Sequence, residues 1–557
     1  MAASAQSTIV KRHDQMFPIL DEHEIDRVRR FGEVKTFETG QALAEVGKVG
    51  LGLIIILSGH VTVTQRDVSG RHTPIITHGS GSFMGELAQM SGRPSLVDAV
   101  AADKVEALVI VPNKLRALLI AEAELGERIM RALILRRVGL LETGAGPIIV
   151  GRACDSDVLR LQNFLSRNGH PNVGLDPDTD QEARALIERF HVEPSALPIV
   201  LCPSGKMLQN PTEESLARCI GLLGPIDSNR IYDVTIVGAG PSGMAAAVYA
   251  ASEGLSVLVL DCRSFGGQAG ASSRIENYLG FPTGITGMAL MGRAFSQAQK
   301  FGAEFAIPSQ VVGLEVQKNG AAPIFVLKLA DGESVRSRTI VVASGVRYRR
   351  LGVDNLGDFE GSSVHYWASP LEGKLCSEQE VVLVGAGNSA GQATVYLAGR
   401  AKKVWLLARG GDISLSMSQY LVDRIKGLPN VEILTKCTVT NLEGSDGILD
   451  AICWRNASGE DVRRKIQHLF LFIGADPETN WLTETGVKLD PKGFVLTGVG
   501  AGEECNSLET SVPGIFAIGD VRAGSIKRVA AGVGEGAQVV AALHTYLSFI
   551  HPAHPAT

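Results

Sequence analysis

The chain has 557 residues and a mass of 59.0 kDa, too long for one hydrophobic core at roughly 100–200 residues per domain. A net charge of -6 and a pI near 6.1 argue against a nucleic-acid-binding protein, which normally presents a basic surface. Apolar runs such as 51–57 are far shorter than the ~20 residues of a membrane span, and the N-terminus lacks the apolar core of a signal peptide. The eight cysteines include no CxxC and no metal-ligand cluster, so we expect a reducing cytoplasm and no metal site.

The first domain, expected over 1–145, shows short strand patterns followed by a helix. Residues 37–41 are typical of a strand and turn, and 53–63 predict a hairpin around Ser58-Gly59. A glycine-rich turn at 79–82 precedes 83–88, and strand character returns over 97–111. The apolar periodicity from Leu115 to Leu141 predicts one long helix.

Residues 146–227 are expected to form a second, smaller α/β domain. The pattern predicts, in chain order, a strand at 147–150, a helix over 157–168 and a second helix that ends at about 190. A strand at 197–201 and a last helix over 213–222 follow. This order resembles a thioredoxin or glutaredoxin domain, and the resemblance implies a cis peptide at Leu197-Pro198.

Two glycine-rich motifs then follow apolar strands and open helices, which is the context a dinucleotide-binding loop requires. The first contains Gly238, Gly240, Pro241, Ser242 and Gly243, with Asp261 at the end of the next strand, where a ribose-binding acid belongs. The helix N-terminus supplies N–H groups and partial positive charge for a pyrophosphate.

The second motif contains Gly385, Gly387, Asn388, Ser389 and Ala390. Arg409 follows its second strand where an acid would favour NAD, and a guanidinium attracts a 2′-phosphate. The sequence therefore favours NADPH over NADH at this site. Two nucleotide sites in one enzyme indicate a flavin reduced by a nicotinamide.

Further motifs over 231–550 resemble the thioredoxin reductase family of flavoproteins. They are Gly266-Gly267-Gln268, Ile275-Glu276-Asn277-Tyr278, Val342-Ala343-Ser344-Gly345, Phe516-Ala517-Ile518-Gly519-Asp520 and Lys527-Arg528-Val529-Ala530. The resemblance implies FAD contacts at Gly267, Gln268, Asn277, Gly519, Asp520 and Val529. It also implies a discontinuous FAD domain (228–350 and 478–557), an inserted NAD(P)H domain (351–477), two Rossmann-like folds and a homodimer.

The family's redox dithiol is missing from this sequence. Trp367 and Pro370 stand where its two cysteines should be, and neither can accept electrons by disulfide chemistry. Cys376 is nearby but alone, and we expect it to be a packed thiol. His365 is the only general acid or base to consider there, and we expect it to be a solvated loop residue.

The thioredoxin-like domain does not restore a CxxC pair. Its expected motif position reads Cys154-Asp155-Ser156-Asp157, and Cys202 lies ~13 Å beyond Pro198 along the strand at ~3.3 Å per residue. Cys154 precedes a helix, which could acidify its thiol, so it is the one weak catalytic candidate against an inert relic.

The first domain resembles cyclic-nucleotide-binding domains, which are β jelly rolls followed by a helix. Gly85, Glu86 and Leu87 match the phosphate-binding cassette, which implies a ribose contact for Glu86. Ser95 occupies the place of the phosphate-binding arginine, with Arg93 two residues before it. That loss costs about 1.5–3 kcal/mol, or about tenfold to a hundredfold in affinity. Another ligand, or a docking and dimerising role, stays open beside a cyclic nucleotide.

The leading hypothesis is a cytoplasmic, NADPH-dependent FAD oxidoreductase that passes electrons to an unidentified small-molecule or protein acceptor without a dithiol relay. Dioxygen, a quinone, a small disulfide and a partner protein are candidate acceptors. One alternative is a redox or nucleotide-responsive sensor flavoprotein with little turnover. The other is a true thioredoxin-disulfide reductase that uses the thiols of a partner. No membrane association is expected.

Overall fold

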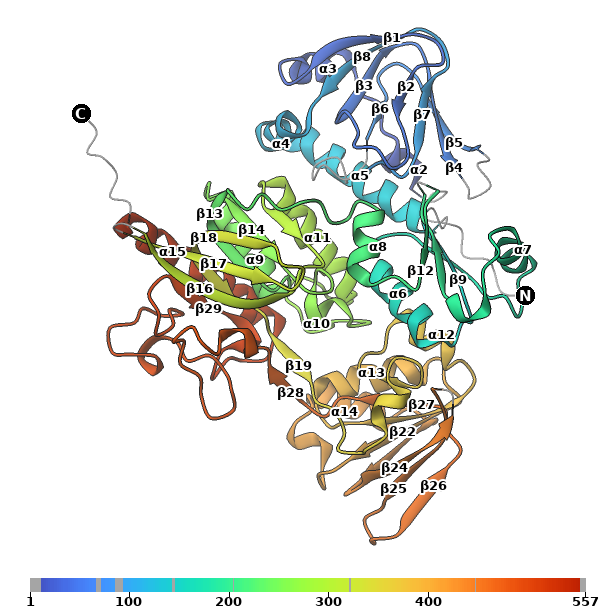
Figure 1. Ribbon diagram of the computed structural model, residues 1–557, viewed down its shortest axis with the longest axis vertical. Helices are drawn as coiled ribbons and strands as arrows, with labels where there is room; N and C mark the ends of the chain where they lie inside the picture. Colours follow the sequence, from blue (N-terminus) through green and yellow to red (C-terminus); the bar gives the residue numbers. More distant parts are fainter. Residues whose placement is uncertain are drawn as a thin grey trace. The chain divides into compact units, whose positions relative to one another are not determined.

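The structure is a computed structural model that describes residues 12–66, 72–85, 94–142, 146–203, 205–319, 322–445 and 447–550. It divides into two compact units, which are described separately (Figure 1). Unit 1 comprises Met1–Ala153, Phe164–Pro225 and Ser296–Pro308. Unit 2 comprises Cys154–Asn163, Ile226–Phe295 and Ser309–Thr557.

Unit 1 begins with two four-stranded antiparallel sheets that enclose an apolar core. Their orders are β1-β8-β3-β6 and β2-β7-β4-β5. Ile54 and Ile56 of one sheet and Val61 and Ala99 of the other belong to the shared core. The strands are β1 (Glu33–Phe37), β2 (Ala42–Ala44), β3 (Leu53–Ser58), β4 (Val61–Arg66), β5 (His72–His78), β6 (Phe83–Met84), β7 (Asp98–Ala101) and β8 (Val105–Ile110).

The hairpin predicted around Ser58-Gly59 is wrong. The chain does turn there, with Gly59 at φ 83°, but β3 pairs with β6 and β8 while β4 pairs with β5 and β7. A short turn between two strands thus leads from one sheet to the other, which local turn chemistry cannot distinguish from a hairpin.

The single long helix predicted from Leu115 to Leu141 is also wrong. Two helices form instead, α4 (Pro112–Ala121) and α5 (Ala123–Glu142), separated at Glu122, which has φ -111° and ψ 80°. Arg27 and Arg30, in and just after α3 (Glu22–Arg29), both donate to the Glu122 carboxylate. The apolar spacing continues across the break, so periodicity alone did not reveal it.

The α/β layer of residues 146–225 has strand order β10-β9-β11-β12, with β10 parallel to β9 and β11 antiparallel to both of its neighbours. The strands are β9 (Ile148–Val150), β10 (Val173–Leu175), β11 (Ile199–Leu201) and β12 (Met207–Gln209). The helices are α6 (Ser156–Arg167), α7 (Gln181–Arg189) and α8 (Glu213–Cys219). The predicted cis bond at Leu197-Pro198 is confirmed.

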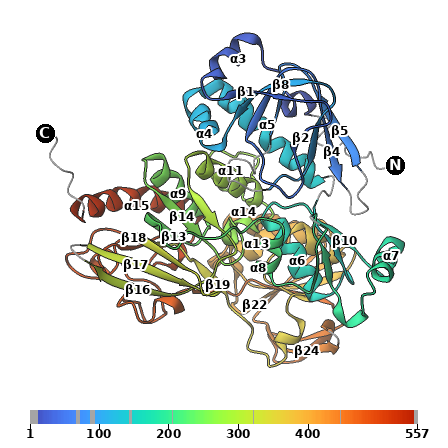
Figure 2. The same cartoon turned by 45° about the horizontal axis from the view of Figure 1, so that its top comes forward.

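Unit 2 contains a sheet with the strand order β14-β13-β18-β17-β16, and β29 pairs with β18. The strands β13 (Ile231–Val237), β14 (Val257–Leu260), β18 (Ser334–Val342) and β29 (Ile515–Ala517) are parallel, whereas β16 (Val311–Asn319) and β17 (Ala322–Leu329) extend the sheet antiparallel. Helices α9 (Pro241–Ser252) and α15 (Val529–Ile550) pack against each other (Figures 1 and 2). The segment near residue 520, which precedes α15, therefore lies close to the first glycine motif, which precedes α9.

A second parallel sheet in unit 2 has the order β20-β27-β21-β22-β23. Helices α13 (Asn388–Ala398) and α14 (Gln419–Lys426) share an apolar core with it. A second core joins it to an antiparallel sheet of β24 (Thr438–Ser445), β25 (Ile448–Arg455) and β26 (Asp461–Arg464). Its strands are β20 (Val364–His365), β21 (Glu380–Val384), β22 (Lys403–Ala408), β23 (Val431–Thr435) and β27 (His468–Leu471).

The strands β19 (Val346–Tyr348) and β28 (Ala475–Pro477) form an antiparallel ribbon where the chain leaves and re-enters the first sheet region (Figure 1). No helix in the described part of the chain has the length and apolar character to cross a membrane. The limits of the four predicted domains stay predictions.

Candidate functional site

The first glycine motif forms the turn between β13 and α9. Gly238 has φ 114°, and a Cβ there would lie 2.1 Å from the carbonyl oxygen of Ala343. A Cβ on Gly243 would lie 1.9 Å from the carbonyl oxygen of Gly238, so glycine is needed for the helix to approach the strand. Gly240 would meet only the Cα of Gly267, at 3.9 Å. The loop thus leaves its backbone accessible to a ligand beside the N-terminus of α9, whose first two residues are Pro241 and Ser242. This geometry fits a pyrophosphate.

Asp261 follows β14 and holds the glycine loop from the side. Its Oδ2 accepts from the N–H of Ala239 at 2.9 Å, and its Oδ1 accepts from the N–H groups of Arg263 and Ser264 at 2.9 and 3.1 Å. The Ser264 hydroxyl is buried with no protein partner in the structure. The carboxylate and this hydroxyl are polar groups suited to a bound nucleotide's ribose.

Gly267 and Gln268 lie against the same loop. A Cβ on Gly267, which has φ 53°, would lie 3.0 Å from the Cα of Gly240. The Gln268 amide donates to the carbonyl of Val346 in β19. Asn277 is exposed, in a loop closed by the Ile275–Ile285 bridge.

Gly519 and Asp520 lie beside the start of α9. A Cβ on Gly519 would lie 2.2 Å from the Ser242 hydroxyl, so the two segments touch. The Gly519 N–H donates to Glu535 at 2.6 Å. Burial raises the pKa of Asp520, and Lys527 donates to its main-chain carbonyl. Val529 is the first residue of α15.

Glu535 was missed by sequence reasoning. Its carboxylate accepts from both the Gly519 N–H and the Arg522 guanidinium, which fixes the turn before α15. In the sequence it is marked only by its place three residues after Gly532 and directly before Gly536, two glycines that pack on α9 near Ser242.

The second glycine motif repeats this arrangement between β21 and α13. Gly385 has φ 151°, and its Cβ would lie 2.6 Å from the carbonyl oxygen of Phe472. A Cβ on Gly387 would meet nothing within 4 Å, so this loop is also open. Asn388 accepts from the N–H of Ser418 at 2.7 Å, and the next residues of α13 are Ser389 and the buried Ala390. Arg409 is exposed directly after β22.

The segment in place of the dithiol is held by polar contacts and not by thiols. The Trp367 indole N–H donates to Glu372 at 3.0 Å, and Pro370 begins α12 (Pro370–Leu375), which Ser369 caps. Cys376 is fully buried, as expected, and burial raises its pKa to about 12.

The expectation of a solvated loop for His365 is wrong. His365 lies buried in β20, and its Nε2 is 3.2 Å from the Nδ1 of His468 in β27. Burial lowers the pKa of each histidine to about 4. Pairing of two short parallel strands, which the local polar sequence does not reveal, removes His365 from water.

The N-terminal candidate pocket is described in part. Glu86, Leu87 and Arg93 lie outside the described residues. Ser95 is buried and its hydroxyl donates to the carbonyl of Val97 at 2.8 Å, so it is already engaged. The Gly85 carbonyl accepts from Arg136 at 3.2 Å.

Arg136 of α5 was not found from the sequence. Its buried guanidinium donates to the carbonyls of Met16, Phe83 and Gly85 and lies over the Phe17 and Phe83 rings. Burial lowers its pKa to about 9. This residue ties the start of the candidate cassette to the helix.

Cys154 is exposed two residues before α6, so its thiol is accessible. Cys262, the residue after Asp261, is exposed as well. Among the described residues, no group of three or more His, Cys, Asp or Glu side chains is placed to hold a metal ion.

Comparison with known proteins connects these sites to a family. Residues 232–536 match the pyridine nucleotide-disulphide oxidoreductase family, and residues 34–122 match the cyclic nucleotide-binding domain. A thioredoxin reductase of Mycoplasmopsis pulmonis (strain UAB CTIP) is 31% identical over 312 residues, 56% of this chain and 96% of that protein. The F component of the alkyl hydroperoxide reductase of Pseudomonas putida is 29% identical over 323 residues, 58% of this chain and 59% of that protein.

Solved structures agree with this relationship. The thioredoxin reductase of Lactococcus lactis in its FR conformation has a TM-score of 0.52 at 26% identity, over 57% of this chain and 99% of that one. The T. acidophilum thioredoxin reductase also has a TM-score of 0.52, at 28% identity over 58% of this chain and 99% of that one. The chain belongs to the pyridine nucleotide-disulphide oxidoreductase family. It is an FAD- and NAD(P)H-dependent oxidoreductase that resembles thioredoxin reductase and has a cyclic nucleotide-binding domain near its N-terminus.

Proposed function

We propose that this oxidoreductase passes electrons from NADPH through FAD directly to an external acceptor, without a dithiol of the thioredoxin reductase type. The observation that carries this proposal is the segment at 367–376. Trp367 and Pro370 replace the two cysteines, and the nearby thiol of Cys376 is fully buried with a raised pKa. A side chain of this kind cannot exchange disulfides with a partner.

The residues that would hold FAD are those of the first cradle. The backbone around Gly238 and Gly240 would bind the pyrophosphate, Asp261 the ribose, and Asp520 the remaining chain of the cofactor. FAD, when bound, accepts hydride from a nicotinamide and releases the electrons to an acceptor. The protein's part is to position both nucleotides and to control access to them.

NADPH is proposed as the reductant because Arg409 stands exposed where a 2′-phosphate would lie, and no acid occupies that strand end. Arg409→Ala should raise the KM for NADPH about tenfold, the loss expected for one charge-assisted pair, and leave the KM for NADH unchanged. Lys402→Ala, which removes a charge from an exposed position at the opposite end of β22, is the matched control. Steady-state kinetics with both nucleotides checks this, and an equal effect of Arg409→Ala on both would refute the assignment.

The acceptor is tested with purified holoenzyme that has been reduced with NADPH without oxygen. Dioxygen, a quinone, a small disulfide and oxidised thioredoxin are then added one at a time while flavin absorbance is followed. Rapid reoxidation by an acceptor other than thioredoxin supports the proposal. Rapid reoxidation by thioredoxin alone would contradict it and would favour a reductase that uses partner thiols, with Cys154→Ser testing the one candidate thiol of its own.

A sensor with little turnover is the second candidate, and the N-terminal cyclic nucleotide-binding domain favours it. The domain is proposed to bind a ligand that relies little on an arginine at position 95, because Ser95 is buried and donates to its own segment. A reduced flavin that persists with every acceptor, and whose reoxidation changes when cyclic AMP or cyclic GMP is added, would favour the sensor.

The remaining assignments rest on resemblance. Residues 146–225 are proposed to be a thioredoxin-like domain, because the strand order, the cis proline and the helix positions fit that fold. A jelly roll for the first domain, the domain limits, a homodimer and a cytoplasmic location are likewise proposals.

A further inference from the structure

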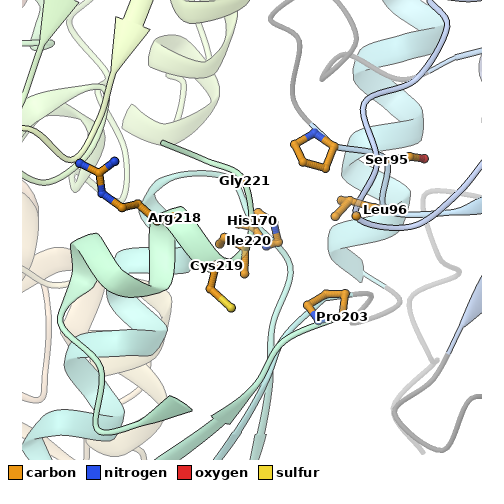
Figure 3. A pocket seen from close by; sticks show the side chains of 10 residues that line it. Ser95, Leu96, His170, Pro203, Arg218, Cys219, Ile220 and Gly221 are labelled. Carbon is orange, nitrogen blue, oxygen red and sulfur yellow. The ribbon is translucent and has the colours of Figure 1, made fainter. Parts of the chain in front are cut away.

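Two cysteines of the α/β layer in unit 1 meet, although they are far apart in the sequence. Cys202 follows β11, and Cys219 is the last residue of α8. Their side chains are hydrogen-bonded to each other. Pro203, the residue after Cys202, and Cys219 line the same cavity of about 140 Å³ (Figure 3). The two thiols are therefore neighbours, and the cavity opens beside Cys219 and the residue that follows Cys202.

The two thiols differ in access. Cys202 is 3% exposed and its N–H is bonded to the carbonyl of Lys206 in the turn before β12. Cys219 is partly exposed and faces the cavity. A reagent in the cavity therefore reaches Cys219 first, and Cys202 lies behind it. Burial, and then the hydrogen bond with Cys219, raise the pKa of Cys202, which makes it the less reactive of the two thiols.

The cavity has room for a small oxidant. Its volume of about 140 Å³ is well above the roughly 10–15 Å³ that a cavity needs to hold one water, so hydrogen peroxide fits. The polar side chains of His170 and Arg218 are part of its lining (Figure 3).

We propose that Cys202 and Cys219 form a redox site that hydrogen peroxide converts into an intramolecular disulfide. The Cys219 thiolate attacks one peroxide oxygen, the O–O bond breaks, and the released hydroxide takes a proton to become water. The Cys202 sulfur then attacks the Cys219 sulfenic acid, the S–S bond forms, and the Cys202 proton leaves with the hydroxyl as a second water. Two thiols and one peroxide thus give one disulfide and two waters. The site goes beyond the proposed function because this step needs neither FAD nor NADPH.

The test is peptide mapping of the full-length protein after reduction, removal of the reductant, treatment with one equivalent of hydrogen peroxide, and alkylation of free thiols. We expect a Cys202–Cys219 cross-linked peptide as the main oxidised product, and its loss on addition of dithiothreitol. Both cysteines found alkylated, or Cys219 linked mainly to another cysteine, would overturn the proposal. This result is independent of the flavin reaction, so failure of one proposal leaves the other standing.

Variants identify the order of the two steps. In Cys202→Ser, Cys219 should accumulate as the sulfenic acid, which dimedone traps at least tenfold more than in the unaltered protein. Cys219→Ser should protect Cys202 from both dimedone and cross-linking. Cys154→Ser, which removes an exposed thiol outside the pair, is the control and should leave the cross-link unchanged. Dimedone labelling of Cys219 that is equal with and without Cys202 would contradict the role of Cys202, even if the serine variants were less stable.

Discussion

At the scale of single residues, Asp261 is the side chain that joins the first glycine loop to β14. Asp261→Asn replaces one carboxylate oxygen by an NH2 group, which cannot accept a hydrogen bond. The N–H groups of Ala239, Arg263 or Ser264, and the proposed ribose contact, therefore lose an acceptor. We expect the Kd for FAD to rise tenfold or more, measured by fluorescence as FAD is added back to the apoprotein. Asp354→Asn, at an exposed position, should leave the Kd unchanged. Equal FAD affinity in both variants would exclude Asp261 from the site.

Gly243 has a packing role that can be separated from ligand contact. In Gly243→Ala the new methyl group would lie 1.9 Å from the Gly238 carbonyl oxygen, so α9 must move from the sheet at a cost of about 1–3 kcal/mol. We expect a lower Tm and weaker flavin retention. Gly292→Ala in α11 (Gly287–Lys300) meets nothing within 4 Å and should stabilise by about 0.5–1 kcal/mol. Unfolding curves of both variants check this, and a Gly243→Ala protein as stable as the parent would refute the packing argument.

Residue patterns revealed local geometry and missed long-range partners. The glycines of the two motifs, together with the strands beside them, predicted both strand–loop–helix turns. The resemblance at Leu197-Pro198 predicted the cis bond. Glu535 and Arg136 act through partners that are distant in sequence or are main-chain carbonyls, which carry no sequence signal. The Cys202–Cys219 pair was missed because its spacing matches no CxxC motif, and only the fold brings β11 and α8 together.

At the scale of secondary structure, the strands β20 and β27 keep two histidines out of water. The pKa of His365 and His468 falls from the ordinary 6.5 to about 4, so the folded state binds fewer protons than the unfolded chain. Their stability contribution is complete above pH 6.5 and is lost as the pH falls toward 4. We expect the free energy of unfolding to drop between pH 6.5 and 5 by roughly 2 kcal/mol for each histidine.

His365→Phe, which keeps a ring beside Phe470, should remove part of this dependence in urea unfolding measured across that pH range. His23→Gln, on the exposed side of α3, should behave as the parent. A pH slope that is the same in all three proteins would show that these histidines are protonated in the folded state.

Helix limits show what periodicity leaves undecided. Residues 112–142 carry one apolar pattern but form two helices separated at Glu122, whose carboxylate accepts hydrogen bonds from Arg27 and Arg30 of another segment. The turn at Gly59 likewise looked like a hairpin and instead separates two sheets. In both cases the deciding partner lies in another part of the chain.

At the scale of the whole molecule, a two-nucleotide oxidoreductase is combined with an N-terminal region that contains a cyclic nucleotide-binding domain. The order of these parts could be predicted from motifs, because each motif has a fixed place between strand and helix. The molecule that receives the electrons could not be predicted, because the family's dithiol is absent and no other sequence motif specifies an acceptor.

The most direct test of the dithiol-free electron path is an anaerobic titration of the purified protein with NADPH, followed by absorbance. We predict oxidised flavin that bleaches with NADPH and that oxidised thioredoxin does not restore, whereas an external acceptor does. A colourless protein that does not take up FAD, or flavin that thioredoxin reoxidises as fast as any other acceptor, would contradict this path.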